Sequence, residues 1–340
     1  MFEKFKKEIK FNLLFFITVV TGLIFIYSTY AWFSSALNVV ISDFRMTTDS
    51  TDGIYISLDG ITWSDSVDIT ENNVISLLTD TYPEHKTQWP DKLRPVSAIG
   101  LSSADQQRYK FYTYRHHKIW YPKYDNSDVM DFYALNEDEV NDKSPFVAFD
   151  VFIKNVTPSP YSDNLYLDAG TKFTNADPDN TDDTALNSLR LGIVFSDVTT
   201  VDDTYANIQG LSCNGRCRDF VYEPNAFSHT DYSINTLAKH GVTLKNGDYY
   251  PTYGMHTGGD NIKIWSGAKN DKVAIDPDHY QLQTTATDIE DPIFQIPKGI
   301  VKARIYVWVE GQDIDIIETE SDGYKVSVSI NFRKDHASLN

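Results

Sequence analysis

Two segments near the C-terminal end alternate strictly between apolar and other side chains. In residues 301–309 every odd position is apolar, whereas the even positions carry the long or amphipathic side chains of Lys302, Arg304, Tyr306 and Trp308. Residues 324–333 repeat the alternation, with the apolar side chains at the even positions. A period of two residues places successive side chains on opposite faces of a β-strand. Both segments are therefore predicted as strands, and 324–333 has one solvent-facing side.

The same pattern predicts strands elsewhere in the chain. Residues 189–195 carry an apolar stripe, and residues 146–153 are apolar on both faces, which places them centrally in a sheet. Asp59-Gly60 predicts a hairpin turn. Helical periodicity is nearly absent beyond the N-terminus. Further strands are expected at 38–46, 53–57, 109–121, 164–173 and 217–223, and short helical pieces at 70–79 and 232–240.

The fold class follows from these strands and the loops between them. Tyr, Phe and Trp are abundant (21, 19 and 6 residues), as suits half-buried sheets. Many strands joined by loops rich in Asp, Asn, Gly and Pro predict a mainly β fold, an antiparallel, jelly-roll-like β-sandwich with long loop insertions. Residues 37–340 are expected to form one β-sandwich domain, and about 196–290 an inserted loop or cap region within it.

The first 36 residues read as an export segment. Four lysines among residues 4–10 precede an uncharged stretch from Phe11 to Ser42. A basic start, an apolar centre and small residues at alternate positions are typical of a secretory signal peptide. The small residues predict cleavage between Ala31 and Trp32, or between Ala36 and Leu37.

An uncleaved membrane anchor is the alternative for the same segment. A helix needs about 20 apolar residues to cross a bilayer, and residues 11–31 reach that length. The lysines would hold the N-terminus in the cytoplasm. In either case the rest of the chain lies outside the cytoplasm, and the membrane is a partner through residues 1–36.

Residues 29–34, Thr-Tyr-Ala-Trp-Phe-Ser, resemble the end of the signal peptide in the camelysin/TasA family. A second similarity lies in residues 305–313, where many exported proteins of the same Gram-positive bacteria carry a "WxEGQD" strand. The resemblance implies export through a SipW-type signal peptidase. It also implies kinship with fibre-forming subunits of biofilm matrices.

The charge of the chain limits its partners. The net charge of −18 would repel the phosphates of nucleic acid and of anionic lipid headgroups. Nucleic acid is therefore excluded as a partner. Self-association or a cell-surface partner is expected instead.

The two cysteines, Cys213 and Cys217, flank an Asn-Gly pair. In an exported protein this spacing predicts a disulfide that pins a tight loop. Free thiols are one alternative, and metal or redox chemistry is another. Redox motifs have two intervening residues rather than three, and a zinc site would need two further ligands.

An acidic loop at residues 174–187 offers candidate calcium ligands in Asp177, Asp179, Asp182 and Asp183. The EF-hand arrangement fails here, because that motif requires Gly at the sixth position and Glu at the twelfth. An ordinary solvated loop is the alternative. Calcium is the one cofactor considered, and no metal site is assigned firmly.

No catalytic constellation is present in the sequence. Gly-x-Ser-x-Gly, His-Glu-x-x-His and phosphate-binding glycine loops are missing. A non-enzymatic role is therefore expected. The basic and aromatic segment 112–121, with His116 and His117, would stack on sugars, dock a neighbouring subunit or form part of the core. Asn155-Val156-Thr157 matches the glycosylation sequon. Such matches are common by chance, and in a bacterial protein this one does not indicate glycosylation.

Two functions fit these observations. The first is an exported, surface-associated structural protein, such as a matrix or filament subunit that assembles by strand donation. Leu37, Val39 and Ile41 follow the predicted cleavage sites and would form the donated apolar face. Alternatively, this segment is the first strand of its own domain. The second function is a membrane-anchored extracellular binding module for carbohydrate or another cell-surface partner.

Overall fold

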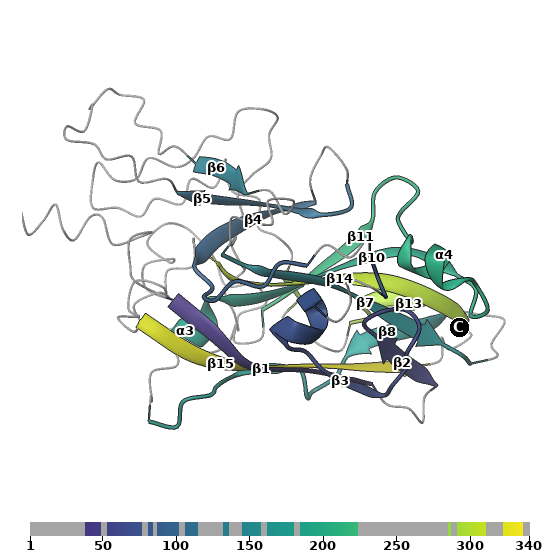
Figure 1. The fold of residues 1–340 in the computed structure, drawn as a ribbon, viewed down its shortest axis with the longest axis horizontal. Coiled ribbons are helices and arrows are strands. Elements are labelled where there is room, and N and C mark those ends of the chain that lie inside the picture. Colours follow the sequence, from purple (N-terminus) through teal and green to yellow (C-terminus); the bar gives the residue numbers. More distant parts are fainter. Residues whose placement is uncertain are drawn as a thin grey trace, which may run out of the picture.

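The chain is mainly β, as predicted, with two mostly antiparallel sheets and few helical turns (Figure 1). The computed structural model describes residues 38–48, 53–76, 81–83, 87–101, 106–114, 132–135, 145–157, 162–179, 184–223, 285–286, 291–310 and 322–335. The predicted export segment, residues 1–36, lies outside them. Within the described ranges, no helix is long and apolar enough to cross a membrane.

The first sheet brings the two ends of the described chain together. Its order is β13 (Phe294–Ile296), β8 (Asp163–Leu167), β15 (Asp322–Asp335), β1 (Asn38–Thr48) and β3 (Ser66–Asp68), and β9 (Lys172–Asn175) also pairs with β15. β1 and β15 run parallel, whereas the other pairs of this sheet are antiparallel.

The second sheet is the larger. Its order is β12 (Thr285–Ala286), β11 (Arg218–Tyr222), β10 (Leu189–Thr199), β14 (Gly299–Glu310), β4 (Pro95–Leu101), β5 (Tyr109–Tyr114) and β6 (Phe132–Leu135). β7 (Val147–Asn155) pairs with both β14 and β2 (Ile54–Ser57). The helical turns are η2 (Asn72–Ser76), α3 (Thr184–Asn187) and α4 (Tyr205–Gln209).

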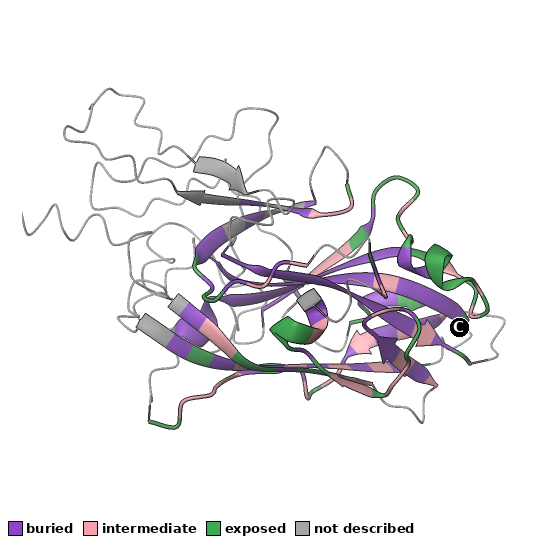
Figure 2. Ribbon diagram, viewed as in Figure 1, coloured by how far each residue is buried: buried purple, intermediate pink, exposed green. Residues whose placement is uncertain are grey.

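The main core takes apolar side chains from both sheets. The odd positions of β14 meet the even positions of β15 in one buried cluster, which also receives Val39, Phe44 and Met46 of β1. Figure 2 shows the buried residues of both layers. Because burial of apolar surface is the dominant favourable term in folding, this shared core is what holds the two sheets together.

A second apolar cluster covers the outer face of the larger sheet. Tyr306 and Trp308, at even positions of β14, pack there against Tyr109 and Phe111 of β5. The Tyr109 and Tyr306 rings stack with their centroids 4.8 Å apart. The β4–β5 hairpin therefore provides a lid of aromatic side chains over one end of this sheet.

β7 is buried on both faces, as its sequence predicted. Phe149 and Val151 belong to the main core, whereas Ala148 and Phe146, the residue just before β7, belong to the outer cluster. Its neighbours β14 and β2 place it inside the sheet.

The other strand predictions hold with local differences, except that residues 115–121 of the strand expected at 109–121 lie outside the described ranges. Residues 164–173 form two strands, β8 and β9, because the chain turns at Asp168–Thr171. The helical piece expected at 70–79 is the short turn η2, and the one at 232–240 lies outside the described residues. Of the insertion expected at 196–290, the described part includes the end of β10, α4 and β11, and β11 is a strand of the second sheet.

The predicted turn at Asp59-Gly60 is present. Gly60 has a φ of +74°, a conformation that glycine adopts without strain. The Asp59 carboxylate accepts the backbone N–H groups of Ile61 and Thr62 and the hydroxyl of Ser57, each at 2.8 Å. Burial raises the pKa of this carboxyl, but the hydrogen bonds outweigh burial and bring the pKa below its usual value.

Residues 38–48 form a strand of this chain's own sheet. β1 pairs with β15 from Asn38 to Thr48, with a register shift between Ile41 and Asp43. The shift moves the inward face from the odd position of Val39 to the even positions of Phe44 and Met46. Ile41 packs partly buried against the same core.

Candidate functional site

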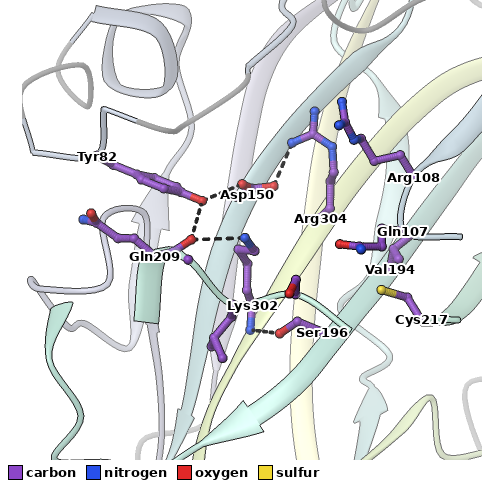
Figure 3. A pocket seen from close by; sticks show the side chains of 13 residues that line it. Tyr82, Gln107, Arg108, Asp150, Val194, Ser196, Gln209, Cys217, Lys302 and Arg304 are labelled. Atoms are coloured by element: carbon purple, nitrogen blue, oxygen red, sulfur yellow. Dashed lines mark hydrogen bonds and ion pairs between the residues drawn. The ribbon is translucent and has the colours of Figure 1, made fainter. Parts of the chain in front are cut away.

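A polar cavity of about 310 Å³ opens on the outer face of the larger sheet, beside the aromatic cluster (Figure 3). β7, β10 and β14 form its floor, and segments around Tyr82, Gln107 and Gly210 form its walls. The lining residues are Tyr82, Gln107, Arg108, Asp150, Val194, Ser196, Gln209, Gly210, Leu211, Ser212, Cys217, Lys302 and Arg304.

Asp150 is the centre of the hydrogen-bond network in this cavity. Its carboxylate accepts the Arg304 guanidinium at 2.7 Å and the Tyr82 hydroxyl at 2.8 Å. The Tyr82 hydroxyl also lies 3.1 Å from the carbonyl oxygen of Gln209. Both members of the ion pair are buried. Hydrogen bonds of this kind are what a buried ion pair needs to offset the cost of removing its charges from water.

Lys302 supplies a second cation on the same strand face. Its ammonium donates to the Gln209 carbonyl at 3.1 Å, and its backbone N–H donates to the Ser196 hydroxyl at 3.0 Å. Burial lowers the pKa of Lys302. The nearby Asp150 carboxylate opposes this change, and the charges of Arg304 and Arg108 reinforce it.

The described lining of the cavity is rich in positive charge. It contains Arg108, Lys302 and Arg304 but one carboxylate, Asp150, in a chain whose net charge is −18. Guanidinium and ammonium groups recognise carboxylate, sulfate and phosphate through charge-assisted hydrogen bonds. The chemistry of the cavity therefore suits a small anion.

The β14 sequence explains why the cavity lies here. Its even positions share one face, so Lys302, Arg304, Tyr306 and Trp308 follow one another along the outer side of the sheet. The lid from β5 covers Tyr306 and Trp308 and ends at Arg304, whose Nε donates to the Tyr306 hydroxyl at 3.2 Å. The two cations beyond the lid border the open space.

The residue pattern of the sequence did not reveal this site. The alternation marked Lys302 and Arg304 as one face of a strand but gave no sign of what covers that face. One signal of the site was available in the sequence. Asp150 lies in the otherwise apolar segment 146–153, and a charged side chain at the centre of a sheet needs a partner.

The predicted disulfide is present next to the cavity. Cys213 and Cys217 are joined, with their Cα atoms 5.3 Å apart. Cys217 lines the cavity and belongs to the outer apolar cluster, and its backbone N–H donates to the Gln106 carbonyl at 2.9 Å. The disulfide loop is therefore a structural part of the cavity wall.

The candidate calcium ligands are only partly described. Asp177 and Asp179 lie in a turn after β9, where the Asp177 carboxylate accepts the Asp179 backbone N–H at 3.1 Å. Asp182 and Asp183 lie outside the described residues. Among the residues placed by the structure, no group of three or more His, Cys, Asp or Glu side chains could hold a metal ion.

The remaining predicted positions are divided in the same way. Val39 and Ile41 lie in β1, whereas the candidate cleavage residues Ala31, Trp32, Ala36 and Leu37, and also His116 and His117, lie outside the described ranges. Asn155 of the sequon is fully buried, so its side chain is inaccessible to a glycan.

Comparison with protein-family models, with curated proteins and with solved structures found no match.

Proposed function

We propose that this chain is an exported, surface-associated structural protein, a β-sandwich with jelly-roll-like strand order that assembles into a matrix or filament by strand donation. The observation that carries this proposal is the position of β1. This strand begins at Asn38, shortly after the predicted export segment of residues 1–36, and lies between β15 and β3 in the first sheet.

The contacts of β1 are those that a donated strand needs. Its backbone pairs with β15 along its whole length. On the other side, its described backbone contacts are those with β3 and the residues flanking β3, from Phe44 to Thr48, and with Leu93 at Val39. Its apolar side chains fill the main core. A strand joined to its sheet by main-chain hydrogen bonds and a few buried side chains can be exchanged for the same strand of a neighbour.

A cysteine pair across β1 and β15 tests the proposal. Asp43 and Ser327 are register partners whose side chains share a 3.1 Å hydrogen bond, so Asp43→Cys with Ser327→Cys places two thiols at neighbouring positions. The matched control is Lys172→Cys with Ser329→Cys, a register pair of β9 and β15 that does not involve β1. Purified, processed protein is concentrated, oxidised and examined by electron microscopy and by gels without reductant.

Strand donation predicts filaments, with a covalent ladder of oligomers for the β1 pair and monomers for the control pair. Persistent monomers at high concentration, with both pairs closed inside one chain, would contradict the proposal. Filaments in which the β1 pair closes within one chain would retain assembly but exclude donation of this strand.

The cation-lined cavity favours a second function, an extracellular binding module for an acidic carbohydrate on a cell surface. Arg108, Lys302 and Arg304 offer charged donors, and Gln107 and Ser196 offer neutral polar groups for sugar hydroxyls.

Calorimetric titration with glucuronate, and with glucose as the neutral reference, tests this second function. Binding of glucuronate alone is expected, at least tenfold weaker in Lys302→Met and unchanged in the control Arg216→Gln, which alters an exposed arginine outside the cavity. Equal binding of glucuronate by all three proteins would exclude the cavity as the site.

A further inference from the structure

Three buried polar side chains from three strands meet where the two sheets come together. Lys334 lies near the end of β15, Asn155 ends β7 and Asp163 begins β8. The side chains of Lys334 and Asp163 are 2% and 1% exposed, and Asn155 is fully buried. Their register neighbours Leu165 and Ile296 are fully buried apolar residues. A lysine is rarely enclosed so completely.

The geometry places a nucleophile beside a carboxamide. The Lys334 Nζ lies 2.9 Å from the Asn155 Oδ1. Since a C=O bond is about 1.2 Å long, Nζ is no farther than about 4.1 Å from the Asn155 carbonyl carbon. Reaction distances for bound partners are roughly 3 to 3.5 Å, so a small movement of the lysine side chain brings the atoms together.

One oxygen of Asp163 touches both nitrogens that a reaction between these groups would involve. Its Oδ2 lies 3.0 Å from the Lys334 Nζ and accepts the Asn155 Nδ2 at 2.9 Å. A carboxylate in this position can take a proton from the attacking amine and give it to the departing nitrogen, which is the role of a general acid–base.

We propose that Lys334 and Asn155 are joined by an intramolecular isopeptide bond, formed by the chain itself with Asp163 as proton carrier. Asp163 takes a proton from the Lys334 ammonium, and the neutral amine attacks the Asn155 Cγ, so a C–N bond forms and the carbonyl π electrons move to Oδ1. Asp163 transfers the proton to Nδ2. The Cγ–Nδ2 bond breaks, the C=O bond re-forms and ammonia leaves, while the attacking nitrogen gives its surplus proton back to the Asp163 carboxylate. The products are one amide, one ammonia and a protonated Asp163, with no oxidant or other reactant.

The surroundings supply the other requirements of this acyl transfer. The Thr157 backbone N–H donates to Asn155 Oδ1 at 3.1 Å, where negative charge develops during the attack. The Ile296 carbonyl accepts Asn155 Nδ2 at 3.2 Å, and the Thr157 hydroxyl accepts Lys334 Nζ, so both reacting groups are oriented. The proton transfer converts a buried ion pair into neutral groups, which an apolar site favours.

The carboxamide of Asn155 is favoured over the carboxylate of Asp163 as the acceptor. Attack on Asp163 would release water and would leave the reaction without the group that bridges the two nitrogens. The bond to Asn155 covalently ties β15 of the first sheet to β7 of the second. This inference does not depend on the proposed function, because it concerns the chemistry of the folded domain itself.

Peptide mapping of the folded, full-length protein tests the bond. In linked protein, trypsin should leave Asn155–Lys172, which also contains Asp163, attached to Lys334–Asn340, because an acylated Lys334 is no longer a cleavage site. Unlinked protein should instead release Asn155–Lys172 and Asp335–Asn340 separately. The proposal predicts one branched species containing Asn155–Lys172 and Lys334–Asn340, lighter than their sum by one ammonia, with fragment ions that place the branch at Asn155. A branched species lighter by one water would place the bond on Asp163 and overturn the assignment. Two separate, unmodified peptides from folded wild-type protein would overturn the proposal outright.

Three variants sharpen the test. Asp163→Asn keeps the size of the side chain but removes the proton carrier, so the two peptides should be recovered unlinked. Lys334→Met should also prevent the link, whereas Lys325→Met, an exposed lysine on the same strand, should retain it in full. A link that persists in Asp163→Asn would exclude Asp163 from the reaction. Since the wild-type protein alone decides whether the bond exists, variants that fail to fold leave the test intact.

Discussion

At the scale of single residues, the cost of burying a charge decides what Lys302 contributes. Its ammonium donates to the Gln209 carbonyl, and burial lowers its pKa. A base whose pKa falls on folding binds protons less readily in the folded state. The charged group therefore lowers the free energy of unfolding. This penalty disappears as the pH rises from the folded-state pKa toward 10.5, the usual value for lysine.

Lys302→Met should consequently leave stability unchanged or raise it by up to about 1 kcal/mol at pH 7. The advantage over wild type should shrink as the pH approaches 10.5. Urea denaturation at pH 7 and pH 10 measures both effects. A variant that is clearly less stable at pH 7 would show that the lysine is a net stabilising partner of Asp150.

Gly192 is required by a close approach rather than by its backbone angle. A Cβ at this position would lie 2.4 Å from the Tyr109 Cε2 and 3.0 Å from the Trp308 ring. Gly192→Ala should therefore cost roughly 1 to 3 kcal/mol, because the Tyr109 and Trp308 rings must shift. The comparison is Gly210→Ala, where the nearest atom to a Cβ is 3.1 Å away and the aromatic cluster is untouched. Thermal unfolding of the two variants should separate them clearly.

At the scale of elements, the disulfide between Cys213 and Cys217 closes a short loop and at the same time fixes part of the cavity wall. Replacing Cys213 and Cys217 together by Ser should cost about 2 kcal/mol, the loss expected for so short a loop. Because Cys217 packs beside Val194 and Val221, the variant should also alter the cavity. Guanidinium titration gives the stability change. A loss well above 4 kcal/mol would mean that the loop organises more of the outer cluster than its own turn.

The alternation of apolar residues was sufficient to place most strands but not to pair them. Residues 301–309 and 324–333 could be predicted as strands because one face of each strand packs against the main core. The residues of a strand do not show whether it pairs with the next strand in the sequence or with a distant one. The pairing of β1 with β15 was therefore not predictable. The cavity and the cluster of Asn155, Asp163 and Lys334 each combine distant segments, and a spacing rule cannot detect such sites.

At the scale of the whole molecule, the two apolar clusters should differ in stability. The main core takes side chains from both sheets, whereas the outer cluster depends on β4–β5, whose backbone pairs with β14 only at Val309 and Glu310. Hydrogen exchange should therefore release the amides of β5 before those of β10 and β14, by at least tenfold in rate. Equal protection of β5 and β14 would indicate that the hairpin unfolds only with the entire domain.

The parallel pairing of β1 and β15 determines how the domain would respond to pulling. Asn38 lies opposite Asp322, and Thr48 lies opposite Phe332, so the incoming and outgoing ends of the chain leave the pair at opposite ends. Tension between those ends is directed along the strands and drives them to slide past each other. The hydrogen bonds between β1 and β15, which extend over roughly 30 Å, then bear the force together instead of breaking one after another. A protein connected to its neighbours through these two ends would therefore be mechanically strong in the direction in which a filament is stretched.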